Sequence, residues 1–287
     1  MTKSIGLICD RIGWEEKSII REIKKRGIEL CLVNLKKDTI FRLDNFGWSN
    51  GLNCDVFLQR SVSYYKCLYS TIIFEKLGYK VVNSGLTAEI SGNKLYSSLI
   101  LSKNGLLTPK TYVTFSMDSA LRLIKKIKKP VVLKPLIGSW GRLISFVNDY
   151  ETAYAILRDR ENSNNSLYKI YYIQEYISKT RDIRAFVVGE EVVAAMYRYN
   201  LPGDWRSNAT RGAKTEPCKI TPEIEEVSLK AAKAVNGEIL GIDLIESENG
   251  FYVVEVNHNP QFKVLSKTSG VNIYEKIVDY LCKTYSK

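Results

Sequence analysis

The pattern of apolar and polar residues predicts a compact α/β unit at the start of the chain. Apolar runs at residues 4–9 and 28–33 flank the segment 15–26, whose isoleucines recur at helical spacing. This order predicts a β-α-β unit, which implies a parallel sheet with a right-handed crossover. The same pattern predicts strands at 54–58 and 80–82 and a helix at 64–77. We therefore expect residues 1–83 to form an open α/β domain.

The carboxyl edge of this first sheet is where a ligand is expected. No Gly-x-Gly-x-x-Gly motif follows the first strand, so the sequence gives no support for dinucleotide binding. Arg60-Ser61-Val62-Ser63 follows a predicted strand, at the edge where open α/β sheets bind ligands.

The pattern in the rest of the chain predicts both helices and strands. Helices are expected at 86–90, 93–103, 118–128, 149–160, 221–236 and 272–285, with Asn83-Ser84 capping the first of them. Strands are expected near 107–113 and at 130–134, 143–147, 168–176, 179–188 and 191–199. Because the strands between residues 171 and 257 have tight connections, we expect them to form one antiparallel sheet in an α+β arrangement.

Residues 241–257 predict a β-hairpin that carries unusual polar positions. Two apolar strands are joined by the turn Ser247-Glu248-Asn249-Gly250, yet Asp243, Glu255 and Asn257 lie inside them. Glu255 and Asn257 share one face, and an odd number of loop residues would place Asp243 opposite Glu255. Three converging oxygen ligands are the kind that Mg²⁺ prefers. The alternative is a hairpin with charged edge positions.

The loop after Lys134 is a candidate phosphate site. A predicted strand ends at Lys134 and is followed by Gly138-Ser139-Trp140-Gly141 before the next strand begins. Short Gly/Ser loops expose backbone N–H groups to phosphate oxygens, and a strand lysine supplies positive charge. No Gly-Lys-Ser/Thr leads into a helix, so this is not a Walker loop. A plain hairpin turn remains the alternative.

Composition favours an ordinary globular protein of the cytoplasm. The chain has 287 residues, of which 45% are hydrophobic, and no apolar run reaches the length of about 20 residues that spans a membrane. Its start becomes polar too soon for a secretory signal. The six cysteines have no Cys-x-x-Cys spacing and there is one histidine, so no zinc site is expected. Disulfides are not expected either, because the cytoplasm keeps thiols reduced.

The net charge of +11 indicates an anionic partner. Nucleic acid is one such partner, but no zinc finger, RNP-like aromatic sheet or helix-turn-helix pattern accompanies the charge. A nucleotide or an acidic protein therefore fits better.

The order of these motifs resembles the ATP-grasp ligases across residues 84–287. Lys94 precedes the strand lysine and its glycine loop, and a Gln-Glu-Tyr-Ile strand end, three arginines and the Asp…Glu-x-Asn hairpin follow. The strings VVLKPLIGSWGR, YIQEYI, RDIRAFVVGE, ATRGA and EVNHNPQFK resemble the LysX group, close to the RimK-like glutamate ligases. Trp140 discriminates most, because RimK relatives usually have glutamine there. The resemblance implies an ATP-grasp fold, with a central subdomain at 84–172 and a C-terminal antiparallel-sheet subdomain at 173–287.

The resemblance also implies a reaction. LysX proteins join the α-amino group of 2-aminoadipate to the side-chain carboxylate of the C-terminal glutamate of a small acidic carrier protein, in lysine biosynthesis. Relatives attach glutamate for arginine synthesis, and the reaction passes through an acyl phosphate and releases ADP. A dimer or tetramer is implied as well. The alternatives are a RimK-like ligase that adds glutamate to another protein or cofactor, and a catalytically silent ATP-binding module.

Carried onto this sequence, the resemblance implies a binding site for ATP and two Mg²⁺ ions. Asp243, Glu255 and Asn257 would hold the metal ions, with Glu255 bridging both. The nucleotide would be bound by Lys94, Lys134, Gly138, Ser139, Trp140, Gly141, Gln174, Glu175, Tyr176, Ile177 and Asp182, with Asn208 as a nearby partner. Arg184, Arg198 and Arg211 would hold carboxylates or the acyl phosphate, although one of the three is expected to form only a surface salt bridge.

The sequence departs from the family pattern at three positions. Asn93 stands where aspartate is common, Ala213 replaces a glycine, and Gln261 replaces an expected glutamate. The last two changes fall near the expected amino-acid pocket and leave the substrate open. His258, the one histidine, is interpreted as a pocket residue rather than a general base.

Overall fold

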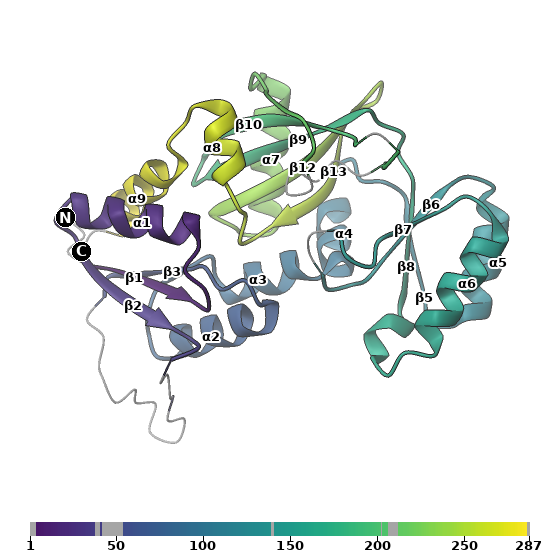
Figure 1. The fold of residues 1–287 in the computed structure, drawn as a ribbon, viewed down its shortest axis with the longest axis horizontal. Coiled ribbons are helices and arrows are strands. Elements are labelled where there is room, and N and C mark those ends of the chain that lie inside the picture. The colour runs from purple at the N-terminus through teal and green to yellow at the C-terminus, as the bar shows by residue number, and fades with distance from the viewer. Residues whose placement is uncertain are drawn as a thin grey trace.

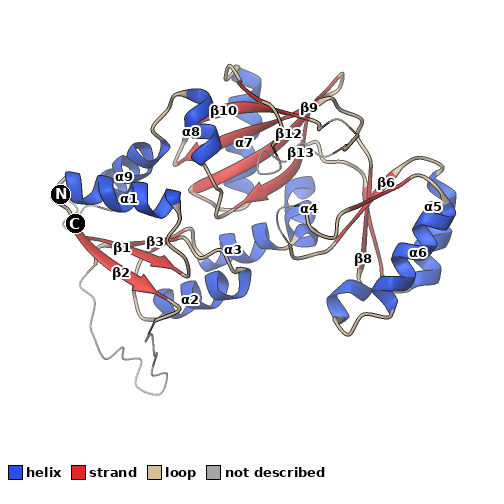
Figure 2. Ribbon diagram, in the orientation of Figure 1, coloured by secondary structure: helices blue, strands red, loops and turns tan. Residues whose placement is uncertain are grey.

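The computed structural model describes residues 4–37, 41, 54–138, 141–201, 203–205 and 212–285. Within these ranges the strands form three sheets, and in Figure 2 the red strands of the central sheet, seen edge-on, lie apart from those of the other two. The expected α/β and α+β organisation is confirmed, with a parallel sheet followed by two antiparallel sheets. None of the helices in the described ranges is long and apolar enough to cross a membrane.

The N-terminal sheet is parallel and has the order β2-β1-β3-β4 (Figure 1). Its strands are β1 (Ser4–Cys9), β2 (Glu29–Asn34), β3 (Val56–Gln59) and β4 (Val81–Val82), and its helices are α1 (Trp14–Lys25) and α2 (Tyr64–Lys76). Every residue of β1 and β3 is buried, as expected for central strands covered on both faces. The predicted β-α-β unit is confirmed.

The central sheet is antiparallel and has the order β5-β8-β6-β7. Its strands are β5 (Thr111–Thr114), β6 (Val131–Lys134), β7 (Ser145–Val147) and β8 (Tyr171–Glu175). Helices α5 (Met117–Ile127) and α6 (Tyr150–Glu161) share its hydrophobic core and lie together beside it in Figure 1. A 3-10 turn, η1 (Ser166–Lys169), occupies the start of the strand expected at 168–176. The expectation that residues 171–257 form one sheet is wrong, because β8 pairs with β5 and β6.

The C-terminal sheet is antiparallel and has a core on each face. Its order is β11-β10-β9-β12-β13, with β9 (Arg181–Val188), β10 (Glu191–Tyr199), β11 (Thr215–Pro217), β12 (Ile239–Ser247) and β13 (Gly250–Asn257). One face packs on α7 (Pro222–Ala234), which Thr221 caps by accepting a hydrogen bond from the Ile224 N–H. The other face packs on α8 (Lys263–Ser269), α9 (Ile273–Thr284) and parts of the N-terminal domain. Helices α3 (Gly85–Gly92) and α4 (Lys94–Lys103) connect the first sheet to the central one (Figure 1).

A β-bulge sets the register of the β12–β13 hairpin. Ser247 pairs with Gly250, so the turn has two loop residues rather than the odd number that the sequence argument required. Asp243 nevertheless lies opposite Glu255, because the register shifts by one residue between Val253 and Glu255. A bulge of this kind moves every following side chain to the other face. The extra residue therefore turns Glu255 toward the same face as Asp243 and keeps Val256 in the core.

Asn83 joins the N-terminal domain to the C-terminal sheet. Its side-chain amide donates to the carbonyl oxygens of Ile239 and His258, both at 2.7 Å. Its Oδ1 accepts from the backbone N–H groups of Glu238 and Ile239, at 2.8 and 3.0 Å. The sequence had predicted a helix cap at Asn83-Ser84, but Ser84 alone caps α3, by accepting from the N–H of Thr87. Asn83 instead connects two domains.

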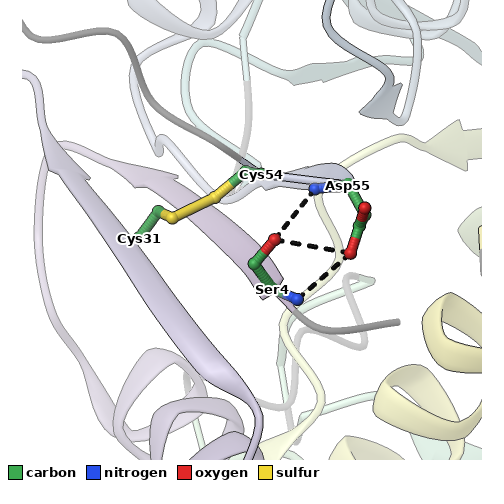
Figure 3. The surroundings of a disulfide bond; sticks show 4 residues. All are labelled: Ser4, Cys31, Cys54 and Asp55. Atoms are coloured by element: carbon green, nitrogen blue, oxygen red, sulfur yellow. Dashed lines mark hydrogen bonds between the residues drawn. A yellow bond between two sulfur atoms is a disulfide. The ribbon is translucent and has the colours of Figure 1, made fainter. Parts of the chain in front are cut away.

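A disulfide links β2 to the segment just before β3, which corrects the expectation that the cysteines are unpaired. Cys31 in β2 and Cys54, just before β3, are bonded, with their Cα atoms 6.8 Å apart (Figure 3). Beside it, the Ser4 N–H donates to Asp55 Oδ2 at 3.1 Å and the Asp55 N–H donates to Ser4 Oγ at 3.2 Å. The two cysteines lie 23 positions apart in the sequence, so only the packing of the sheet brings them together.

Candidate active site

A cavity of about 620 Å³ lies between the three sheets, and its wall is shared by all of them. The N-terminal domain contributes residues of the β1–α1 loop and of the end of β3. The start of α4 and the end of β6 form one side, and β9, β10, β12 and β13 form another. The segment from Asn257 to Leu265 completes the wall. A cavity at the meeting point of domains is the usual place for a small-molecule site.

Lys94 projects into this cavity from the first turn of α4. Asn93 caps the helix, because its Oδ1 accepts from the Leu95 N–H at 3.0 Å. The Lys94 Nζ donates to the Gly138 carbonyl oxygen at 2.8 Å and lies 3.2 Å from Glu255 Oε1. Asparagine and aspartate are equally good N-caps, so the departure at Asn93 leaves Lys94 well positioned.

Lys134 is held in place by a chain of hydrogen bonds. Its Nζ donates to Gln174 Oε1 at 2.6 Å, and Gln174 Nε2 donates to Thr111 Oγ1 and Tyr172 OH, at 2.9 and 3.0 Å. Burial lowers the pKa of Lys134 to about 8, against the opposing effect of the Glu255 carboxylate. Gln174 is buried and is not part of the cavity wall. Its side chain therefore acts on the cavity only through Lys134, which it orients by accepting a hydrogen bond.

The three oxygen-bearing residues of the hairpin lie together on the cavity wall. Asp243 is opposite Glu255, and Asn257 is opposite Gly241 in the same ladder. Asn257 donates through its Nδ2 to the Gly241 carbonyl oxygen at 3.4 Å. Two carboxylates and an amide oxygen on one surface match the oxygen ligands of Mg²⁺, so these residues fit the metal that the family implies.

Asp243 is also the centre of a buried ion-pair network. It accepts two hydrogen bonds from Arg184, at 2.5 and 3.0 Å, and lies 3.0 Å from Arg198 Nη2. Burial by itself would raise the pKa of Asp243, but the two guanidinium groups outweigh it and hold that pKa below its usual value. A carboxylate offers about four lone-pair directions, so three bonds leave room for about one further cation contact.

Asp182 and Lys179 extend this network away from the hairpin. Asp182 Oδ1 accepts from Arg198 Nε at 2.6 Å, and Asp182 Oδ2 accepts from Lys179 Nζ at 2.9 Å. Both carboxylate oxygens are therefore bonded to cationic side chains, whereas the family resemblance had implied that Asp182 binds the nucleotide. Its evident effect is to fix the direction of Arg198. The sequence argument missed Lys179, which lies three positions before Asp182 in the same charged string.

The strand end that was expected to bind part of the nucleotide lies outside the cavity wall. Glu175, Tyr176 and Ile177 do not line the cavity, and the N–H groups of Glu175 and Tyr176 already bond to the carbonyl oxygens of Lys110 and Pro130. Tyr176 packs edge-on against Trp205, with ring centroids 5.9 Å apart. Trp205 does line the cavity, and no sequence signal marked it.

Four of the expected site residues, Ser139, Trp140, Asn208 and Arg211, lie outside the described residues. Of the glycine loop, Gly138 and Gly141 are described and both line the cavity. Gly141 has a φ of +67°, a left-handed conformation that glycine adopts without strain.

His258 and the end of β3 form the part of the wall nearest the N-terminal domain. His258 lines the cavity, and burial, with a smaller contribution from Arg60, lowers the pKa of its imidazole to about 4. The imidazole is therefore neutral near pH 7. Arg60, Ser61 and Val62 also line the cavity, as expected for the carboxyl edge of the sheet. Arg11 and Trp14 join them, and neither was marked by a motif.

Three sheets around a cavity that combines lysines with a carboxylate hairpin define an ATP-grasp ligase. A family model for a RimK-like ATP-grasp domain matches residues 91–281, and a model for a LysX preATP-grasp domain matches residues 5–90. The chain therefore belongs to the RimK-like ATP-grasp family, and within it to the LysX type. It is an ATP-dependent, ADP-forming ligase.

Individual relatives support this assignment over almost the whole chain. An alpha-aminoadipate–LysW ligase LysX from Saccharolobus solfataricus is 36% identical over 268 residues, covering 93% of this chain and 96% of the relative. A glutamate–LysW ligase ArgX from Sulfurisphaera tokodaii is 32% identical over 285 residues, covering 99% of both. The solved structure of the ATP-grasp ligase PsnB, complexed with minimal precursor, Mg and ADP, has a TM-score of 0.73 at 17% identity. It covers 98% of this chain and 97% of that chain, and it shows a shared fold.

Proposed function

We propose that this ligase joins the amino group of 2-aminoadipate or glutamate to a carrier protein. The acceptor group would be the side-chain carboxylate of the C-terminal glutamate of a small acidic carrier of the LysW kind. The observation that carries this proposal is the convergence of Lys94, Lys134 and the Asp243–Glu255–Asn257 surface in one cavity. Similarity to both LysX and ArgX over almost the full chain supports the carrier, and it leaves both amino acids in the proposal.

The chemistry requires a carboxylate to become an electrophile. A carboxylate reacts poorly with an amine because its leaving group would be oxide, so the oxygen is first phosphorylated by ATP. Lys94 and Lys134 would bind the phosphates and offset the repulsion between phosphate and carboxylate. Mg²⁺ held by Asp243, Glu255 and Asn257 would neutralise charge on the β- and γ-phosphates. Glu255, at the centre of this surface, would contact both ions.

Two arginines would then bind the carboxylate substrate and the acyl phosphate formed from it. Arg184 and Arg198 line the cavity beside Asp243, and a guanidinium fork matches a carboxylate or acyl phosphate in geometry. Arg211 is proposed for the same task. In the second step the amine attacks the acyl carbon and loses a proton, which an oxygen of the departing phosphate would accept.

The nucleotide would lie between the central and C-terminal sheets. Loop residues Gly138 to Gly141 would cover the phosphates, and the strand end at Glu175, Tyr176 and Ile177 would bind adenine. The Ile177 N–H is not used in the backbone hydrogen bonds of the described chain, which supports this placement. Asp182 is proposed to act near the ribose through Arg198 and Lys179, and Asn208 beside the metal.

The net charge of +11 suits an acidic carrier, because opposite potentials accelerate encounter. The direct test incubates the protein with Mg-ATP, an acidic carrier ending in glutamate and either amino acid. We expect the carrier to gain the mass of one amino-acid residue, with ADP formed in equal amount. No mass gain with either amino acid would refute the proposal.

Two alternatives make different predictions in the same assay. A RimK-like ligase would modify another protein or a cofactor tail, which a lysate labelled with radioactive glutamate would reveal. A silent ATP-binding module would bind nucleotide without product, and Glu255→Gln would then leave its cellular function intact.

Nucleotide affinity should decline in alkaline solution because of Lys134. The pKa of Lys134 is about 8 in the free protein, and phosphates require its charged form. Below pH 8 the lysine is already protonated and affinity should be constant. Above pH 8 binding must take up a proton, so affinity should fall by up to about tenfold per pH unit. Fluorescent ATP-analogue titrations from pH 6.5 to about 9.5 would measure this.

Lys134→Arg provides the matched control, because arginine stays charged throughout this range. The variant should bind nucleotide with little dependence on pH. An equal alkaline decline in both proteins would show that Lys134 is not the responsible group.

A further inference from the structure

The cavity extends beyond the proposed nucleotide and metal residues into the N-terminal domain. Its far wall contains Arg11 and Gly13 from the β1–α1 loop and Ser61 from the end of β3. Lys263, at the start of α8, also lines this part of the cavity, and its backbone N–H donates to Glu15 of α1. None of these residues has a task in phosphate or metal binding, so this half of the cavity is available to another ligand.

The charges of this wall favour an anion. Arg60 is fixed in place, because its Nε donates to Glu16 Oε1 at 3.2 Å and its Nη1 donates to the Pro260 carbonyl oxygen at 3.0 Å. The positive charge of Arg60 offsets the negative charge of Glu16 in that contact. Glu15 accepts from the backbone N–H of Lys263 at 3.2 Å.

By contrast, the charged ends of Arg11 and Lys263 have no hydrogen bond or ion pair with the residues that the structure describes. Asp10, beside this wall, already accepts from the N–H groups of Val62 and Ser63, at 2.9 and 3.2 Å, so the charged side chains left without a partner here, among the described residues, are the cations Arg11 and Lys263. Long-range attraction and a direct contact would both favour a negatively charged ligand.

Two further features favour an anion at the same place. Ser61 is 1% exposed and lines the cavity, and its hydroxyl has no hydrogen-bond partner among the described residues. A buried hydroxyl without a partner is uncommon and points to a ligand atom. The 12-residue helix α1 begins at this wall after Gly13, which supplies no side-chain cap. Glu15 and Glu16 lie in its first turn and Glu16 accepts from the Gly13 N–H at 2.8 Å, and the helix dipole adds to the positive potential at this end.

We propose that the N-terminal half of the cavity is a carboxylate-binding subsite, with Arg11 as the cation that contacts the carboxylate and Ser61 as a hydrogen-bond donor. The inference rests on the proposed function, in which both substrates bring a carboxylate that does not react. One is carried by the free amino acid, and the other is the α-carboxylate of the carrier's terminal glutamate. The subsite holds one of them and thereby orients the reacting atoms.

The test compares Arg11→Gln and Ser61→Ala with the control Arg21→Gln. Arg21 lies on α1, is exposed and is outside the cavity, so its replacement makes the same change in net charge. Binding is measured first, without turnover, by calorimetric titration of each protein with 2-aminoadipate, with glutamate and with a carrier-tail peptide ending in glutamate. A non-hydrolysable ATP analogue and Mg²⁺ are present throughout. KM values for amino acid, carrier and ATP are then measured separately.

We expect Arg11→Gln to weaken one carboxylate ligand by roughly tenfold to a hundredfold, the usual effect of losing a charged hydrogen bond. Ser61→Ala should weaken the same ligand less, and Arg21→Gln should bind like the wild type. The KM for ATP should not change. A loss confined to the amino acids identifies the free amino acid as the occupant, and a loss confined to the tail peptide identifies the carrier.

The proposal is overturned if the wild type binds none of these ligands, or if Arg11→Gln and Ser61→Ala bind all of them as the wild type does. It is also overturned if binding of all ligands, ATP included, weakens together. A wild type that binds a carboxylate through Arg11 but never modifies a carrier would retain the subsite and refute the proposed function.

Discussion

Glu255→Gln is expected to reduce turnover by roughly a thousandfold while the protein stays folded. Glu255 faces Asp243 across the hairpin and lies 3.2 Å from the Nζ of Lys94, so it stands between the proposed metal and phosphate positions. A glutamine side chain has the same size as glutamate and keeps one side-chain oxygen. It lacks the negative charge that would offset the charge of the two proposed Mg²⁺ ions. The side chain of Glu255 is 32% exposed but that of its partner Lys94 only 10%, so losing this ion pair should lower the free energy of unfolding by about 1–2 kcal/mol.

Asn257→Ala is the control variant, because it removes a proposed metal ligand from the same surface without removing a charge. Asn257 carries no charge, and its loss should reduce turnover by only about tenfold to a hundredfold. Initial rates at rising Mg²⁺ concentration, together with direct binding of Mn²⁺ to each variant, would measure both effects. Equal losses in the two variants would contradict a bridging role for Glu255.

Asn83→Ala is expected to lower the free energy of unfolding by about 4 kcal/mol. Asn83 is 5% exposed and makes four hydrogen bonds, all to backbone groups of residues 238, 239 and 258. Alanine would leave those groups without partners, and each unsatisfied buried group costs about 1–3 kcal/mol, partly relieved by local movement. Urea denaturation followed by circular dichroism would measure the change.

The neighbouring Ser84→Ala is the control, because Ser84 accepts one hydrogen bond as the N-cap of α3. Its loss should cost about 1 kcal/mol, the usual value for a helix cap. If Asn83→Ala proved no more destabilising than Ser84→Ala, Asn83 would not be the junction between domains that its four bonds indicate. Because Asn83 also holds the carbonyl of His258, next to Asn257, nucleotide binding should weaken in Asn83→Ala alone.

Elements with strong local signals were predictable from the sequence. The helix at Trp14–Lys25 and the strand at Ser4–Cys9 are found within about two residues of their expected limits. Local periodicity is enough for such elements, because it depends on which side of the backbone meets the core. The order of the lysines, the glycine loop and the acidic hairpin was likewise enough to identify the family. By contrast, the short helix α8 at Lys263–Ser269 was not foreseen, since it has too few turns to show a period.

Strand partners were harder to predict than strands. The sequence predicts β8 to be the first strand of the C-terminal sheet, but in the structure it lies between β5 and β6 in the central sheet. Pairing depends on contacts between residues far apart in the sequence, and alternating patterns do not specify the neighbour. The disulfide between Cys31 and Cys54 was missed for another reason, because cysteines of a cytoplasmic protein were expected to be reduced.

The facing carboxylates of Asp243 and Glu255 depend partly on the sequence alone and partly on the tertiary structure. The sequence by itself determined that Asp243, Glu255 and Asn257 lie in a hairpin, because turn residues and apolar strands are local signals. Only the tertiary structure decided that Asp243 and Glu255 face each other, through a bulge that follows a two-residue turn. It also decided that Arg184 and Arg198 surround Asp243 and that Arg11 and Ser61 share the same cavity. Such contacts join distant segments, and their free energy depends on burial and geometry that appear only when the sheets pack together.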